Sequence, residues 1–263
     1  MQTRWMNIFT TVVIVLIGLS CYCSAETLSG IQLEPNLISI GAFYNGARAS
    51  LSGEIPGDAE VLIRVSKEAE DIDFFRKGRV WGLFWMNVGK ITFHNLPGVY
   101  MLYLSENISE SLIAHEPELR RMGIGFDALT HNASITPDNS DKDARFREFI
   151  ELKKSDGQYA VHENALVYHL SEPNAATKSF ACDLTIPPAM PQGIYEVTTF
   201  VLKNGGVYLT DTRTLKIEET GLPAKIVSLA FGHGTAYGIL SVLIAITAGL
   251  LMGIIFKSDK SSH

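Results

Sequence analysis

Residues 237–256 read YGILSVLIAITAGLLMGIIF, twenty consecutive residues without a charge. A helix rises about 1.5 Å per residue, so about 20 apolar residues cross the hydrocarbon core of a bilayer. A helix also pairs its backbone polar groups internally, which a lipid environment requires. The stretch therefore predicts a transmembrane helix at 237–256, and the rest of the chain is organised around it.

The first 25 residues have the pattern of a targeting segment. Arg4 provides a positive charge, residues 8–19 form an apolar core, and residues 23–25 are small. These are the three parts of a secretory signal peptide. We therefore expect a signal peptide at 1–25 that is cleaved after Ala25, with an uncleaved membrane anchor as the alternative.

Cleavage of this signal sets the orientation of the predicted span. Residues 26–236 are then exported, with 221–236 as a juxtamembrane segment, and the helix at 237–256 stops their transfer. The tail at 257–263 stays in the cytoplasm. Its two lysines agree with the rule that positive residues flank the cytoplasmic end of a span.

The exported part is acidic. Of the 22 basic and 28 acidic residues of the chain, 19 and 27 lie in this part, because Arg4, Lys257, Lys260 and Asp259 lie outside it. Its net charge is therefore about −8. Nucleic acid and anionic lipid surfaces repel acidic proteins, so this charge argues against both as partners.

Cleavage of the signal peptide also determines which cysteines the mature chain keeps. Removal of residues 1–25 leaves Cys182 as the last cysteine, which excludes an intrachain disulfide. Phe180, Cys182 and Leu184 fall on one face of a predicted strand, because side chains alternate across a strand. We expect a buried apolar thiol, and an intermolecular disulfide is the alternative.

Two β-rich segments flank a helical one in the exported part. In residues 26–105 and 158–220, apolar residues recur at every second position, which is typical of half-buried strands. In residues 106–157 the apolar spacing changes to that of helices. We predict a mainly β fold: an immunoglobulin-like sandwich of two lobes, 26–105 and 158–220, with a helical connector at 106–157 and one C-terminal transmembrane helix.

The clearest helix of the connector follows Ser140. Ser140 and Asp143 resemble a capping box, and Phe146 and Phe149 form the apolar stripe of the helix. Gly157 marks its end.

A short sequence similarity links the two β-rich segments. Gly98 and Tyr100 open one predicted strand with the pattern Gly-x-Tyr, and Gly193 and Tyr195 open another. In immunoglobulin-like sandwiches a tyrosine at such a corner hydrogen-bonds back to the backbone. The similarity favours two β lobes over one large sandwich.

The sequence contains no recognisable catalytic motif. The chain lacks a G-x-S-x-G nucleophile elbow, a phosphate-binding loop and a C-x-x-C motif. His115 and Glu116 begin like a zinc-binding helix but lack the second histidine. We therefore predict no catalytic residue, no cofactor and no metal, and a protein that is not an enzyme.

The most unusual exported stretch is FFRKGRVWGLFW at residues 74–85, where three basic residues lie beside aromatic ones in an acidic domain. Trp and Arg are enriched where proteins bind proteins. In one interpretation, Trp81, Leu83 and Trp85 pack inward, and the nearest turn lies at 87–89. In the other, a partner surface is formed by Arg76, Lys77, Arg79, Trp81 and Trp85.

The predicted span has one face of small residues. Ser241, Ala245, Gly249 and Gly253 follow one another at steps of four, so they lie on the same side of a helix. Small residues allow helices to approach closely in lipid. This row is a candidate packing face against another membrane protein or against a second copy.

The chain resembles a family of bacterial single-pass transmembrane proteins of unknown function, first described in alphaproteobacteria. Trp81 and Leu251 depart from the family, which has smaller residues at these positions. The resemblance spans nearly all of the mature chain and rests on Arg79-Val80-x-Gly82-Leu83-Phe84-Trp85-Met86-Asn87, Leu96-Pro97-Gly98-Val99-Tyr100, the helix at 145–153, Ile186-Pro187-x-x-Met190-Pro191-x-Gly193-x-Tyr195-x-Val197, Asn204-Gly205, and Ala236-Tyr237-Gly238 running into Gly249 and Phe256.

The resemblance implies a location and ranks the functions. It places the span in a bacterial inner membrane and the exported domain in the periplasm. Genes of the family are said to lie near permeases that resemble sulfite exporters. The first hypothesis is therefore an accessory subunit or interaction partner of another membrane protein, such as a transporter. The alternatives are a self-associating envelope scaffold and a tethered periplasmic solute-binding domain or enzyme.

Overall fold

The computed structural model describes residues 30–137, 141–169 and 176–257. The predicted signal peptide at 1–25, the predicted cap at Ser140 and most of the tail at 257–263 lie outside these residues.

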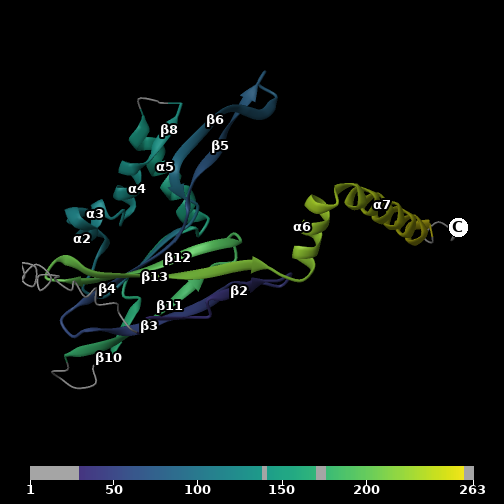
Figure 1. Ribbon diagram of the computed structural model, residues 1–263. Coiled ribbons are helices and arrows are strands. Elements are labelled where there is room, and N and C mark those ends of the chain that lie inside the picture. Colours follow the sequence, from purple (N-terminus) through teal and green to yellow (C-terminus); the bar gives the residue numbers. More distant parts are fainter. Residues whose placement is uncertain (1–29, 138–140, 170–175, 258–263) are drawn as a thin grey trace, which may run out of the picture.

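Two packed β-sheets form the body of the protein (Figure 1). The first sheet has four strands in the order β1 (Gln32–Glu34), β3 (Ala47–Pro56), β11 (Thr177–Ile186) and β10 (Leu166–His169). The second has six strands in the order β2 (Leu37–Ile40), β13 (Gly206–Glu219), β12 (Gly193–Lys203), β4 (Glu60–Lys67), β7 (Tyr100–Leu104) and β9 (Tyr159–His162).

The two β-rich segments at 26–105 and 158–220 form one sandwich and not two lobes, which corrects the prediction. In the four-stranded sheet β3 pairs with β11, and in the six-stranded sheet β4 pairs with β12. Each sheet therefore contains strands from both segments. Hydrogen-bonded ladders between the segments leave neither with a core of its own.

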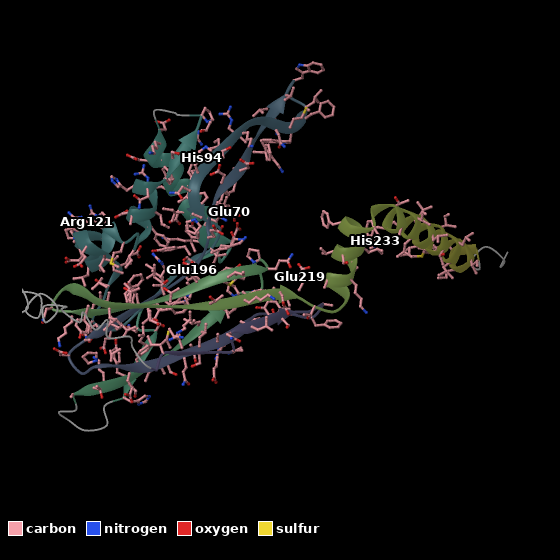
Figure 2. All side chains as sticks on the ribbon, in the orientation of Figure 1. Glu70, His94, Arg121, Glu196, Glu219 and His233 are labelled. Atoms are coloured by element: carbon pink, nitrogen blue, oxygen red, sulfur yellow. The ribbon has the colours of Figure 1, made fainter. Side chains whose placement is uncertain are left out.

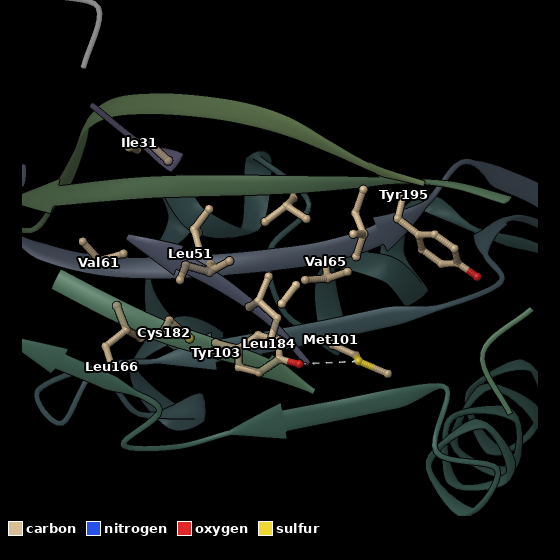
Figure 3. Packing of buried hydrophobic residues seen from close by; sticks show 14 of the residues in the cluster. Ile31, Leu51, Val61, Val65, Met101, Tyr103, Leu166, Cys182, Leu184 and Tyr195 are labelled. Atoms are coloured by element: carbon tan, nitrogen blue, oxygen red, sulfur yellow. Dashed lines mark hydrogen bonds between the residues drawn. The ribbon is translucent and has the colours of Figure 1, made fainter. Parts of the chain in front are cut away.

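The main core lies between the two sheets (Figure 3). Leu51 and Leu184 of the four-stranded sheet face Val61, Val65 and other residues of the six-stranded sheet. Tyr103 crosses this core: its hydroxyl donates to the carbonyl of Thr185 at 3.2 Å and accepts from the Thr185 amide at 3.0 Å. Apolar burial and this cross-sheet tie hold the two layers together.

A second core covers the outer face of the six-stranded sheet. Leu62, Leu102 and Phe200 point away from the main core and are fully buried by the connector together with β5 (Ala69–Val80) and β6 (Phe84–Pro97). The six-stranded sheet is thus buried on both faces. The other covering elements are α2 (Glu110–His115), α3 (Pro117–Arg121), α4 (Phe126–Asn132), β8 (Ser134–Thr136) and α5 (Lys142–Ser155).

The two Gly-x-Tyr motifs behave differently. The Tyr195 hydroxyl donates back to the carbonyl of Pro191, four residues upstream, as predicted for a tyrosine corner. The Tyr100 hydroxyl instead reaches the connector, where it donates to the Gly123 carbonyl at 3.1 Å and accepts from the Gly125 amide at 2.9 Å. The similarity to an immunoglobulin corner therefore holds locally at one of the two tyrosines.

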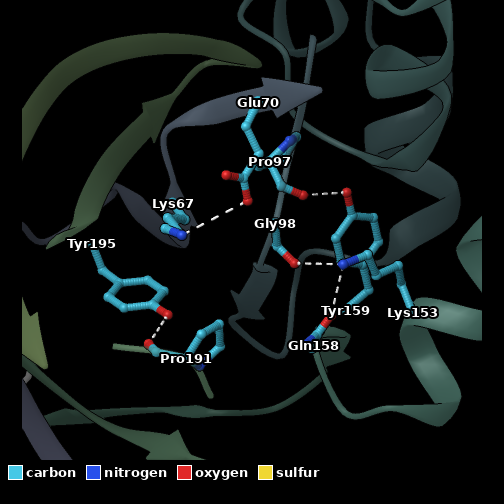
Figure 4. Close-up of polar contacts among 9 residues, drawn as sticks. All are labelled: Lys67, Glu70, Pro97, Gly98, Lys153, Gln158, Tyr159, Pro191 and Tyr195. Atoms are coloured by element: carbon cyan, nitrogen blue, oxygen red, sulfur yellow. Dashed lines mark hydrogen bonds and ion pairs between the residues drawn. The ribbon is translucent and has the colours of Figure 1, made fainter. Parts of the chain in front are cut away.

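The turn before β7 is fastened by the connector (Figure 4). The buried ammonium of Lys153 donates to the Gly98 carbonyl at 3.1 Å and to the Gln158 side chain at 2.7 Å. The Tyr159 hydroxyl donates to the Pro97 carbonyl at 2.7 Å. Burial lowers the pKa of Lys153 below its ordinary value. These bonds join α5 and β9 to the turn at Pro97 and Gly98.

The chain leaves the sandwich at the end of β13. The Thr220 amide donates to the Ile40 carbonyl at 2.8 Å, which ties this exit to the end of β2. Two helices follow, α6 (Leu222–Gly232) and α7 (Gly234–Lys257). Among the described residues, α7 is the one helix that is long and apolar enough to cross a membrane. It begins three residues before the predicted span at 237–256.

Candidate functional site: a projecting arm and an uncovered helix

Strands β5 and β6 form a long antiparallel hairpin that projects from the body (Figure 1). We call this hairpin the arm. Its turn lies at Trp81–Leu83, where the Leu83 amide donates to the Val80 carbonyl at 3.3 Å. The turn predicted at 87–89 is wrong, because these residues lie inside β6.

The arm tip, residues 79–86, exposes its large apolar side chains. Trp81 is 90% exposed, Leu83 79%, Trp85 65% and Phe84 63%. Trp81 also has a φ of 53°, a conformation that bulky residues rarely adopt. The inward-packing interpretation of Trp81, Leu83 and Trp85 is therefore wrong. Figure 2 shows the side chains at the end of the arm without a neighbouring element around them.

The base of the arm is anchored by aromatic packing. The Phe93 ring lies 4.6 Å from the Phe149 ring and 5.5 Å from the Phe146 ring, between centroids. Phe74 meets both Phe93 and Phe149 edge to face. A hollow of about 160 Å³ remains between the arm and α5. The arm is thus held at its base on α5.

The middle of the arm has an irregular register. Arg76 pairs with Gly89 and Lys77 with Asn87, so Val88 is an extra residue in β6. A Cβ at Gly78 would lie 2.8 Å from the Val88 side chain, so a larger residue at position 78 would displace that side chain. The bulge increases the local twist of the hairpin.

The charges of the arm are separated along its length. At the base, Asp73 pairs with Lys90 at 2.9 Å and Asp71 with His94 at 2.8 Å. His94 is labelled near this base in Figure 2. Toward the tip, the exposed side chains are basic: Arg76, Lys77 and Arg79. In the described part of the chain, no carboxylate forms an ion pair with these three.

Arg79 and Trp85 form a preorganised pair at the tip. They face each other across the ladder, and the guanidinium carbon of Arg79 lies 5.3 Å from the centroid of the Trp85 ring. The structure thus brings together all five residues of the predicted partner surface on one exposed hairpin.

Helix α7 presents the predicted small-residue row along its length. All four residues of the row are exposed: Ser241, Ala245, Gly249 and Gly253. The Ser241 hydroxyl donates a hydrogen bond to the Tyr237 carbonyl at 2.8 Å. No residue of the most apolar part of α7 is buried by the rest of the described chain. The whole circumference of α7 is therefore uncovered.

Away from the arm and α7, the carboxylate of Glu60 is engaged in structural contacts. Glu60 accepts from Asn107 at 3.0 Å and from Tyr168 at 3.0 Å, and it lies 3.4 Å from the Lys178 ammonium. Within residues 30–137, 141–169 and 176–257, no group of three or more His, Cys, Asp and Glu side chains is placed to hold a metal.

Cys182 is buried in the main core, as predicted from its strand. Burial raises the pKa of its thiol to about 12. We expect thiol reagents to label the folded protein only after unfolding, and to label the denatured chain at once. A Cys21→Ser, Cys23→Ser background restricts the reaction to Cys182. Rapid labelling of the folded protein would show that the sandwich opens at this position.

A family model described as "Putative transmembrane protein (Alph_Pro_TM)" matches residues 30–258. The chain belongs to this family. The match covers both sheets, the arm, the connector and α7, so the predicted resemblance is confirmed over the described structure. No curated protein and no solved structure matches the chain.

Proposed function

We propose that the protein is a non-enzymatic, single-pass inner-membrane protein that serves as an accessory subunit of another membrane protein, such as a transporter. In this proposal α7 crosses the membrane, the β-rich domain lies in the periplasm and the tail lies in the cytoplasm.

One observation carries this proposal: α7 is uncovered on every side and has a continuous small-residue face. A simple anchor does not require such a face. In lipid, small residues let helix backbones approach closely, and this packing drives association because the hydrophobic effect does not act between helices there. The row is therefore the surface on which we place the partner's helix.

The test is purification of the full chain from its native membrane in a mild detergent, with mass spectrometry of the proteins that accompany it. A multi-span protein in a fixed ratio to this chain supports the proposal. Recovery of the chain alone as a monomer would contradict it. Recovery as a homodimer alone would instead support the envelope scaffold, and would equally contradict the accessory role.

We predict that Gly249→Leu with Gly253→Leu lowers recovery of this partner by at least about tenfold, because two leucines separate the helix backbones. The matched control is Thr247→Leu, which adds bulk on the opposite side of α7, since each residue turns the helix by about 100°. Equal loss in the control, or no loss in the double variant, would rule out this face.

A further inference from the structure

We infer that the arm tip, residues 79–86, immerses in the interface of the bilayer that α7 crosses, with Arg76, Lys77 and Arg79 bound to anionic lipid headgroups. This inference rests on the proposed membrane location of α7. In this inference the arm tip binds lipid, whereas α7 binds the partner protein.

The order of residues along the arm matches the layers of a membrane surface. The aromatic and aliphatic side chains lie at the end, at positions 81–86, and the bases follow behind them. A strand advances about 3.3 Å per residue, so Arg79 lies about 7 Å and Arg76 about 16 Å behind Trp81. The headgroup layer is about 5–8 Å thick on each side. For an arm that enters along the membrane normal, Arg79 falls at the phosphates, and Arg76 lies where the surface potential still acts.

The residue types agree with this placement. Tryptophan is enriched at membrane interfaces because its ring is amphipathic, and both tryptophans of the domain are on the tip. Residues 74–93 contain no acidic residue. The net charge of the exported part argued against an anionic lipid surface, but the structure separates the acids from the tip. The local charge there is positive.

A protein partner explains the tip less well. A stable protein interface uses about 20–30 residues on each side. The exposed apolar cluster of the tip comprises far fewer residues, and the arm stands apart from the larger surfaces of the body. Insertion into lipid requires no complementary surface of this size, so a narrow apolar tip with bases behind it is sufficient.

The arm rises steeply from the body, and in the view of Figure 1 its tip leans toward the side from which α6 and α7 leave the sandwich. At that exit, β2 is joined to Thr220, and the loop after β2 carries Phe43, which is fully exposed. A second exposed aromatic therefore marks the end of the sandwich that is tethered to the membrane.

The test uses the purified full chain in proteoliposomes that contain anionic lipids and brominated lipids. Bromine in the upper acyl chain quenches tryptophan that lies in the interface. Trp81 and Trp85 are the tryptophans beyond residue 25, and Trp5→Phe removes the remaining one. For side chains that enter about 5–10 Å into the interface, we expect at least about twofold quenching and protection from aqueous iodide.

The control places a single tryptophan at the other end of the domain. Val167 is exposed on β10, which lies away from α6 in Figure 1. Val167→Trp in a Trp81→Phe, Trp85→Phe background is expected to be quenched by iodide and not by bromolipid. A triple variant, Arg76→Gln, Lys77→Gln and Arg79→Gln, should lower bromolipid quenching in anionic vesicles to its level in zwitterionic ones.

Two results would overturn the inference. The first is quenching of the native tryptophans by iodide and not by bromolipid. The second is protection from both quenchers that depends on protein concentration, which would show contact with a second copy. Unchanged quenching in the triple variant would contradict the binding of the three basic residues to anionic headgroups. None of these results bears on the accessory role, because the vesicles contain no partner protein.

Discussion

Alkaline solution is expected to unfold the β domain in one step between about pH 10.5 and 12. Four tyrosines are almost fully buried: Tyr100, Tyr103, Tyr159 and Tyr195. Burial raises the pKa of the Tyr100 phenol to about 12 and raises the pKa of the other three well above the ordinary value.

The sign follows from proton binding. Above about pH 10 the unfolded chain releases these phenol protons, whereas the folded chain retains them, so folding stability falls as pH rises. Each tyrosine lowers the free energy of unfolding by about 1.4 kcal/mol per pH unit, and four lower it by about 5–6 kcal/mol per pH unit. A domain has about 5–15 kcal/mol of stability in total. Lys153 acts in the opposite sense, because its folded pKa is lowered, but its contribution stops growing above about pH 10.4.

Tyrosinate absorbance and near-ultraviolet circular dichroism measure this transition on the full chain in detergent. We expect both signals to change together, and Tyr159→Phe to reduce the pH dependence of stability by about a sixth, because burial also raises the pKa of Tyr168 and of Cys182. Gradual tyrosinate formation near pH 10 with the dichroism intact would show that these phenols reach solvent in the folded state.

The second large effect concerns the base of the arm. Phe149→Ala is expected to lower the free energy of unfolding by about 3–5 kcal/mol, the usual cost of removing a buried phenylalanine. The Phe149 ring contacts the rings of Phe74, Phe93 and Tyr159, so its loss affects the arm and the sandwich at once. Chemical denaturation followed by circular dichroism measures the change.

The matched control is Phe75→Ala, one residue from Phe74 on the arm. Phe75 is exposed, so its removal should change stability by no more than about 0.5 kcal/mol. Hydrogen exchange should show faster opening of β5 and β6 in Phe149→Ala than in the control. Similar losses in the two variants would show that the arm is not held by the aromatic cluster.

The strands were largely predictable from alternation, but their assembly into one sandwich was not. Tyr100–Leu104, with the sequence YMLYL, is apolar at every position, and all five of its residues are buried. Such a run is the signal of a strand that is covered on both faces. It indicates a layer on each side of the sheet, which two separate lobes do not provide. Period-two patterns do not specify which strands pair over long sequence distances.

The arm tip shows a different limit. The predicted turn rested on Asn87 and Gly89, which are common turn residues. The actual turn has Trp81 in a left-handed conformation, which residue preferences argue against. The sequence pattern around Trp81 and Trp85 is the same for a hairpin that packs inward and for one that projects into solvent. Their exposure depends on how far the hairpin extends beyond α5, and the sequence alone does not specify that distance.

The exit at Thr220 has a mechanical consequence. Strand β13 lies between β2 and β12, and its ladder with β12 extends from Gly193 and Ile217 to Lys203 and Gly206. Antiparallel hydrogen bonds are perpendicular to their strands. Traction on the membrane helix along β13 therefore loads these bonds in shear and all together, rather than peeling them apart in succession. The domain can thus stay folded when force is transmitted through its tether.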